Sequence, residues 1–180
     1  MQFLTDAFAG TISPFDLTIL FRLTVATLLG AVIGYEREKA GKIAGLRTHT
    51  LVALGSALFT AVSVLLFVDF PSINGTIGYD YHLVANIIVG IGFIGAGAIL
   101  RNGDHVSGTT TAATLWVAAA IGIASGLGYY KEAIATTALA YVVLTALWSL
   151  EKRMHRSVHY AREHPMEANR AWSDEKEAGS

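Results

Sequence analysis

Residues 51–67 read LVALGSALFTAVSVLLF, a predominantly apolar run without a charged side chain. A hydrocarbon core about 30 Å thick is crossed by about 20 apolar residues in a helix. Four further apolar runs of comparable length lie at residues 15–34, 83–100, 110–127 and 133–150. None alternates polar and apolar residues as a membrane-crossing strand does, and helices satisfy their own backbone hydrogen bonds in lipid. The sequence therefore predicts an all-α polytopic membrane protein, a bundle of five transmembrane helices.

The composition agrees with this fold class and excludes several functions. Hydrophobic residues make up 53% of the chain and charged residues 15%, and the mean hydropathy is +0.48. We expect a transmembrane domain over residues 1–150 and a short polar cytoplasmic tail over residues 151–180. The net charge of −1 argues against a nucleic-acid partner. Because the chain has no cysteine, disulfides, thiolate metal sites and cysteine nucleophiles are excluded.

Basic residues are distributed unevenly between the predicted loops. Four lie between residues 35 and 47, none between residues 69 and 82, and six after residue 150. Arg101 lies in the third loop, and only Lys131 lies on the opposite side. Cytoplasmic loops carry the excess of lysine and arginine. The first and third loops and the C-terminus are therefore predicted to be cytoplasmic, with the N-terminus outside.

Glycines recur at short intervals in three of the spans. The run GIGFIG at residues 90–95 matches a dinucleotide-binding fingerprint, but it lies inside an apolar span and no strand precedes it. Small residues allow helices to approach closely in lipid. We therefore interpret eight glycines as helix-packing residues: Gly30, Gly34, Gly90, Gly92, Gly95, Gly97, Gly122 and Gly126.

Two polar residues lie inside predicted spans. Arg22 has no carboxylate three or four residues away, so it either extends to the outer headgroups or has an interior partner such as Asp80. Asn86 shares a helical face with Gly90 and Gly97. We favour a hydrogen bond from Asn86 to a neighbouring helix over the alternative of a polar path through the bundle.

The first cytoplasmic loop has the densest charge. Glu36, Arg37 and Glu38 precede Arg47 and Thr48. Arg101 and Thr111 occupy similar places around the third loop, and we predict a network in which Arg47 and Arg101 bind the two glutamates or helix-end carbonyls. Glu36 and Glu38 are also weak candidates for binding hydrated Mg²⁺, which proteins often hold through one or two carboxylates.

Other polar residues of these loops are interpreted structurally. His49 and His105 lack a second ligand at helical spacing, and we interpret them as lone interfacial histidines. We expect a turn at residues 102–103, followed by Ser107 or Thr109 as the side-chain cap of the next helix.

Four blocks of sequence together resemble the MgtC/SapB family over about residues 15–150. They are residues 30–38 with Arg22, residues 44–52 (AGLRTHTLV), residues 90–101 (GIGFIGAGAILR) and residues 110–116 (TTAATLW). The resemblance implies a bacterial inner-membrane protein tied to magnesium homeostasis, associated in some members with virulence. In the family's namesake it implies restraint of the membrane ATP synthase through the transmembrane domain. Many relatives carry a cytoplasmic C-terminal domain where this chain has a short tail, so the resemblance is to the short, SapB-like branch.

Two functions follow from these observations. The first is a non-enzymatic protein that acts through helix contacts with itself, as a homo-oligomer, or with a membrane complex such as the ATP synthase. The alternative is a Mg²⁺ transporter or channel subunit. An enzyme is the least expected class, because no nucleophile, base and acid occur in a recognisable order. No cofactor is expected other than possible Mg²⁺.

Overall fold

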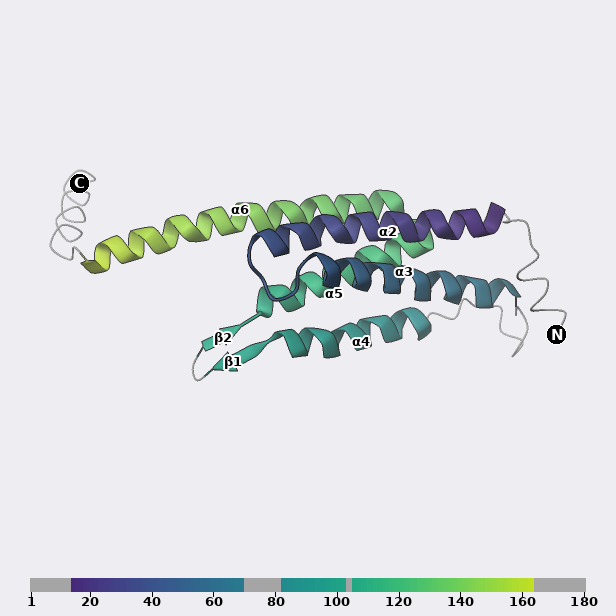
Figure 1. The fold of residues 1–180 in the computed structure, drawn as a ribbon, viewed down its shortest axis with the longest axis horizontal. Helices are drawn as coiled ribbons and strands as arrows, with labels where there is room; N and C mark the ends of the chain where they lie inside the picture. Colours follow the sequence, from purple (N-terminus) through teal and green to yellow (C-terminus); the bar gives the residue numbers. More distant parts are fainter. Residues whose placement is uncertain (1–13, 70–81, 103–104, 164–180) are drawn as a thin grey trace, which may run out of the picture. The chain divides into compact units, whose positions relative to one another are not determined.

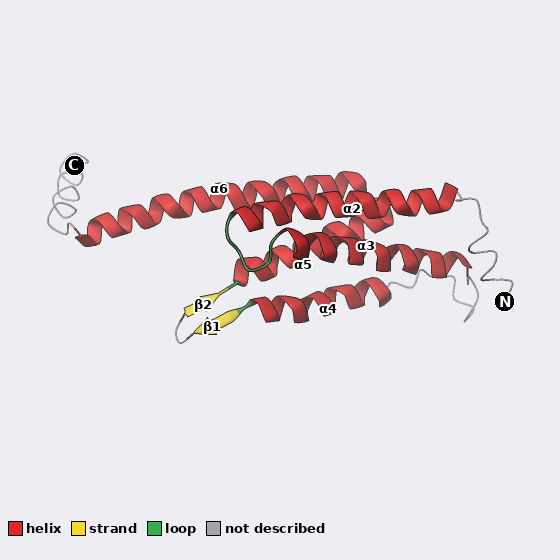
Figure 2. Cartoon of the chain, in the orientation of Figure 1, coloured by secondary structure: helices red, strands yellow, loops and turns green. Residues whose placement is uncertain are grey.

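The structure is a computed structural model that describes residues 14–69, 82–102 and 105–163. The chain divides into two units, Met1–Tyr141 and Val142–Ser180, and each is described by itself. The described residues form helices and one short hairpin (Figure 1, Figure 2). The elements are α2 (Pro14–Lys39), α3 (Leu46–Asp69), α4 (His82–Ala98), β1 (Leu100–Asn102), β2 (His105–Ser107), α5 (Thr109–Leu127) and α6 (Tyr130–Glu163).

Among the described residues, three helical segments are long and apolar enough to cross a membrane: Leu17–Lys39, Leu46–Leu66 and Thr109–Leu127. Helix α4 is also apolar but shorter, with 17 residues. Large apolar side chains such as Leu28 and Phe93 are exposed, whereas alanines such as Ala53 and Ala118 form the interior. Helices that associate in lipid use small residues at their contacts. The helices and this distribution of side chains are those of a membrane protein.

Helix α3 packs against both α2 and α5. Helix α2 runs antiparallel to α3, because Gly30 lies against Ala53 and Gly34 lies against Leu46. A Cβ added at Gly34 would lie 2.7 Å from the Cα of Leu46, so the glycine allows the two backbones to approach closely. Helix α4 packs against α5 and, less extensively, against α3.

Helix α5 runs parallel to α3. A Cβ added at Gly122 would lie 2.3 Å from the carbonyl oxygen of Ala53, and one at Gly126 would lie 2.7 Å from that of Ala57. Since both contacts involve the α3 backbone, no side chain at these two positions fits without a shift of a helix. The interface between α3 and α5 therefore depends on glycine.

The first loop is shorter than the sequence suggests. Helix α2 continues to Lys39 and α3 begins at Leu46, so Glu36, Arg37 and Glu38 lie in the last turns of α2. Arginine, lysine and glutamate favour helices, and basic residues stabilise a helix C-terminus. The apolar run ends at residue 34, but the helix does not. In the same way, α6 continues without a break to Glu163, past the boundary predicted at residue 150, and that boundary stays a prediction.

The connection from α4 to α5 differs from the expectation. Strands β1 and β2 pair antiparallel, with Leu100 opposite Ser107 and Asn102 opposite His105, so a short hairpin joins two helices of the otherwise helical described chain. The N-cap of α5 is Gly108, and no side chain caps the helix, so the prediction of a Ser107 or Thr109 cap is wrong. Gly108 has φ +86°, and a Cβ there would lie 1.9 Å from the carbonyl oxygen of Ala98. Because the backbone at Gly108 lies so close to the end of α4, the N-cap position of α5 requires glycine and cannot hold a serine or threonine.

Candidate functional site

Two glutamates at the end of α2 have different partners. Glu36 forms an ion pair with Arg37, whose side chain is only 4% exposed. Glu38 accepts a hydrogen bond through Oε2 from the backbone N–H of Leu46, at 2.8 Å. This carboxylate thereby caps α3, where a negative charge also favours the helix dipole. Gly45 leaves room for the cap, because a Cβ there would lie 2.7 Å from the same oxygen of Glu38.

His49 connects α3 to α5 inside the bundle. Its ring is fully buried, with Nδ1 2.8 Å from the carbonyl oxygen of Gly45 and Nε2 2.9 Å from Oγ1 of Thr114. A carbonyl only accepts hydrogen bonds, so Nδ1 carries a proton and donates it to Gly45. In the neutral ring, Nε2 then accepts from the Thr114 hydroxyl. The interpretation of His49 as a lone interfacial histidine is wrong, and its place four residues after a glycine, within an apolar helix, is the signal that could have identified it.

Arg22 makes an interior contact at the other end of α2. Its Nη1 donates a hydrogen bond of 2.8 Å to the carbonyl oxygen of Gly126, near the C-terminal end of α5. That end is closed by Gly128, which has φ +89°. A Cβ added at Gly128 would lie 3.5 Å from Nη2 of Arg22. The arginine thus neutralises the negative end of the α5 dipole and exposed carbonyls there, while Asp80, the partner suggested from sequence, lies outside the described residues.

Other buried hydroxyls bond to their own helix. Thr60, Ser125 and Thr137 each donate to the carbonyl four residues earlier, at Ser56, Ile121 and Ala133. This pattern satisfies a polar group in lipid without a partner on another helix. Among the contacts given above, those that join helices through polar side chains involve Arg22, Glu38 and His49.

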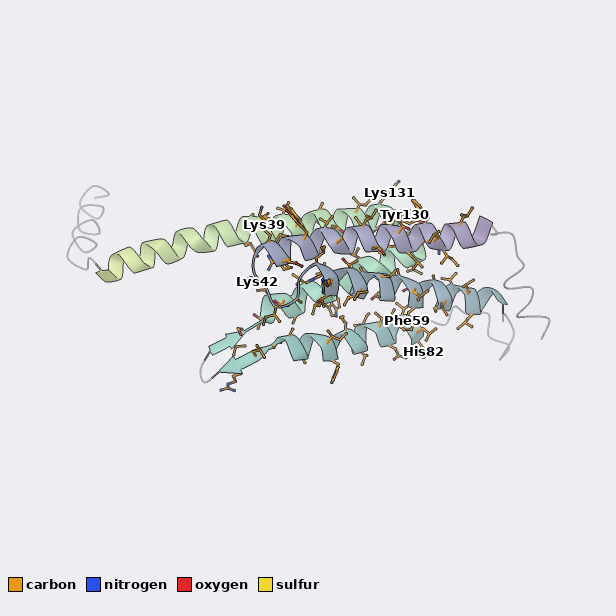
Figure 3. All side chains as sticks on the ribbon, in the orientation of Figure 1. Lys39, Lys42, Phe59, His82, Tyr130 and Lys131 are labelled. Atoms are coloured by element: carbon orange, nitrogen blue, oxygen red, sulfur yellow. The ribbon has the colours of Figure 1, made fainter. Side chains whose placement is uncertain are left out.

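A groove of about 650 Å³ lies between α3 and α4. Its walls are mainly apolar, and its polar side chains are Arg47, Thr48, Ser56 and Asn86. Within the described ranges, no carboxylate lies within 4 Å of the Arg47 guanidinium. No hydrogen bond joins Asn86 to a neighbouring helix in the described part of the chain, although the sequence favoured one. Phe59 lines the far end of the groove (Figure 3).

The remaining predicted site residues are dispersed. Thr111 is buried in the first turn of α5, and Arg101 is exposed on β1. Arg47 is exposed beside the groove, so the arginine paired with Glu36 is its neighbour Arg37. In the described contacts, Glu36 binds Arg37 and Glu38 caps α3, and the wider network that includes Arg101 stays a prediction.

The packing glycines fall into two groups. Those on α2 and α5 lie against α3, as described above. A Cβ added at Gly95 of α4 would lie 3.5 Å from the Cβ of Ala112 on α5. A Cβ added at Gly90, Gly92 or Gly97 of α4 would meet nothing within 4 Å. Three glycines of α4 therefore remain unused within a single chain, among the residues described.

Magnesium binding by Glu36 and Glu38 stays a prediction. Glu36 is engaged by Arg37, and Glu38 by the backbone of α3. In the described segments, no three carboxylate or imidazole side chains cluster closely enough to hold a metal ion.

Comparison with known proteins identifies relatives that match most of the chain. Residues 23–153 match the model of the MgtC family. The chain is 43% identical to Protein SapB of Bacillus subtilis over 139 residues, covering 76% of this chain and 60% of that protein. It is 42% identical to the putative magnesium transporter YhiD of Escherichia coli over 142 residues, covering 78% and 66%. It is 46% identical to Protein MgtC of Salmonella typhimurium over 118 residues, covering 66% and 47%.

The chain therefore spans about half to two thirds of the length of these curated relatives. No solved structure matches it.

Proposed function

Because the chain belongs to the MgtC family, we propose that it is a non-enzymatic inner-membrane protein of magnesium homeostasis. Its mode of action in this proposal is contact between its helices and a second copy or a membrane complex such as the ATP synthase. The family resemblance drawn from four sequence blocks is confirmed by the match over residues 23–153. The magnesium link is supported by the name of the relative YhiD, a putative magnesium transporter.

The observation that carries the proposal is an unused small-residue face on α4. Ala85, Val89, Gly92 and Ala96 follow one another at intervals of four, three and four residues, so they share one face of the helix. All four are exposed, and a Cβ added at Gly92 would meet nothing within 4 Å. Small residues at this spacing allow a second helix to approach closely in lipid. We call these four residues the outer face of α4.

The proposal is tested by the size of the assembly extracted from native membranes. Tagged and untagged copies are co-expressed, and native electrophoresis with co-purification measures self-association and bound partners. Gly92→Leu should remove the assembly, because the side chain blocks close approach at the outer face. Gly97→Leu is the matched control, since it also enters open space but lies on another face. A wild-type protein that is strictly monomeric and binds no partner would contradict the proposal.

The proposal includes five transmembrane spans with the N-terminus outside and the C-terminus in the cytoplasm. Lys39 and Lys42 lie at one end of α2, whereas Lys131 lies away from that end, beside the N-terminal half of the helix (Figure 3), where Tyr130 packs against Phe21; this supports the orientation. Since the chain has no cysteine, Lys42→Cys and Lys131→Cys each introduce a single label. A membrane-impermeant maleimide should label Lys131→Cys in cells with a permeable outer membrane, and Lys42→Cys only after lysis. Labelling of Lys42→Cys before lysis would contradict the orientation.

The alternative, a Mg²⁺ transporter or channel subunit, is favoured by the name of YhiD. It requires a polar route, for which Asn86 in the groove is the main candidate. Purified protein in liposomes with an internal Mg²⁺ indicator separates the two functions. If the protein acts through helix contact, Mg²⁺ uptake should not exceed that of empty liposomes. Uptake that disappears in Asn86→Ala would replace our proposal with the alternative.

A further inference from the structure

The groove between α3 and α4 combines a cationic end with apolar walls. Arg47 and Thr48 lie in the first turn of α3, and the walls beyond them are formed mainly by residues such as Leu51, Ile91 and Ile94. Arg47 is exposed, and no carboxylate of the described residues neutralises it. Basic pockets between transmembrane helices bind anionic lipid headgroups. Arginine also matches a phosphate with two parallel hydrogen bonds.

The length of the groove matches one leaflet. Arg47 and Phe59 line its two ends on α3, and twelve residues of helix rise by about 18 Å. One leaflet contributes half of a hydrocarbon core about 30 Å thick. An acyl chain whose headgroup lies at Arg47 therefore extends along the groove to about the level of Phe59.

Glycines on both walls leave space for this chain. Gly55 of α3 and Gly90 of α4 both line the groove, and a Cβ added at either would meet nothing within 4 Å. Glycines usually allow transmembrane helices to close on each other, but here α3 and α4 leave a groove of about 650 Å³ between them.

From the charge, length and lining of this groove, we propose that it binds one anionic phospholipid. The phosphate lies at Arg47, and one acyl chain lies between α3 and α4 along Gly55 and Gly90. This inference is independent of the proposed function, because it requires only that α3 and α4 lie in a bilayer.

Native mass spectrometry of the delipidated full chain tests the proposal. Phosphatidylglycerol and phosphatidylcholine with the same acyl chains are titrated separately. The wild type should bind the first phosphatidylglycerol about fivefold more tightly, which is the contribution of about one basic side chain near a membrane surface. Arg47→Gln should abolish this preference while phosphatidylcholine binding is unchanged.

Gly90→Leu should remove the first tight lipid of either kind by filling the groove. Gly92→Leu is the control, because it enters open space on the outer face of α4 and should leave lipid binding unchanged even if it disrupts the assembly. Thermal unfolding checks that each variant is folded.

Three results would overturn the inference. The first is equal affinity of the wild type for the two lipids. The second is a Gly90→Leu variant that dissociates an oligomer and leaves lipid binding intact, which would assign the groove to a second copy. The third is loss of phosphatidylglycerol binding in Asn86→Leu, because an acyl chain tolerates leucine on the wall whereas a polar ligand does not.

Discussion

Three polar side chains bind partners close to a helix end. Arg22 binds the carbonyl of Gly126 near the end of α5, and Arg37 pairs with Glu36 in the last turns of α2. His49, in the first turns of α3, binds Gly45 and Thr114. Charges and imidazoles are costly in lipid unless they are paired. The contacts of Arg22 with Gly126 and of His49 with Thr114 join different helices, so these two contribute to holding the helices in register.

The Glu36–Arg37 pair predicts a specific loss of stability. Glu36→Gln leaves the Arg37 guanidinium buried without its counter-charge and should lower the free energy of unfolding by about 3 kcal/mol. Thermal unfolding in detergent measures the change. Glu132→Gln, at an exposed carboxylate in the first turn of α6, is the control and should leave the midpoint unchanged. Equal midpoints for the wild type and Glu36→Gln would show that the pair is only surface charge.

The contact between His49 and Thr114 predicts an energetic coupling between α3 and α5. His49→Phe keeps an aromatic ring but removes the acceptor of the Thr114 hydroxyl and the ring donor to the Gly45 carbonyl, which should cost about 1–3 kcal/mol. Thr114→Val removes the hydroxyl with little change of shape. Because each substitution breaks the same hydrogen bond, the double variant should lose less stability than the sum of the two single losses. Strict additivity would mean that the hydrogen bond does not form.

The sequence indicates several of these residues but not their partners. Arg22, Glu36 and Arg37 were recognisable because charges at the ends of apolar runs demand an explanation. Their partners depend on which helices meet and on where α2 ends, and neither is encoded in local spacing. His49 was misinterpreted because its partner Thr114 lies 65 residues away, and no local pattern connects the two.

At the scale of elements, the hydropathy of the sequence predicts where the helices lie but is less accurate about the residues at which they end. The run at 110–127 corresponds to α5 (Thr109–Leu127), and the run at 83–100 to α4 (His82–Ala98). Helices α2 and α6 continue past their apolar runs, because charged helix-forming residues follow them. The β1–β2 hairpin was missed, since its strands of three residues carry no periodic signal and only close the connection from α4 to α5.

The spacing of glycines in the sequence does not show which of them pack against another helix and which face open space. Replacement of a glycine by alanine should therefore destabilise the protein at a packed position and stabilise it at an open one. Gly122→Ala brings a Cβ to 2.3 Å from a backbone oxygen of α3 and should destabilise the bundle by about 1–3 kcal/mol. Gly92→Ala meets open space and should stabilise α4 by about 0.5–1 kcal/mol. Unfolding midpoints in detergent compare the two. Equal destabilisation would show that α4 packs against a further helix even in detergent.

For the whole molecule, composition is enough to indicate a membrane protein, but not the surface through which it acts. Every described helix carries large apolar side chains that are exposed, as expected for helices that face lipid. What distinguishes α4 is visible only in three dimensions: its outer face is open, and its other side borders a groove. These two features motivate the proposed protein contact and the proposed lipid site, respectively.

Site-specific photo-crosslinking in native membranes tests the proposed helix contact directly. A benzophenone amino acid replaces Val89, which is 73% exposed on the outer face of α4, or Leu28, which is 62% exposed on α2. Illumination should convert the Val89 variant into a discrete protein adduct, either a dimer or a larger species containing one partner, whereas the Leu28 variant should label only lipid. An absence of protein adducts at Val89, or equal adducts at both positions, would contradict action through α4.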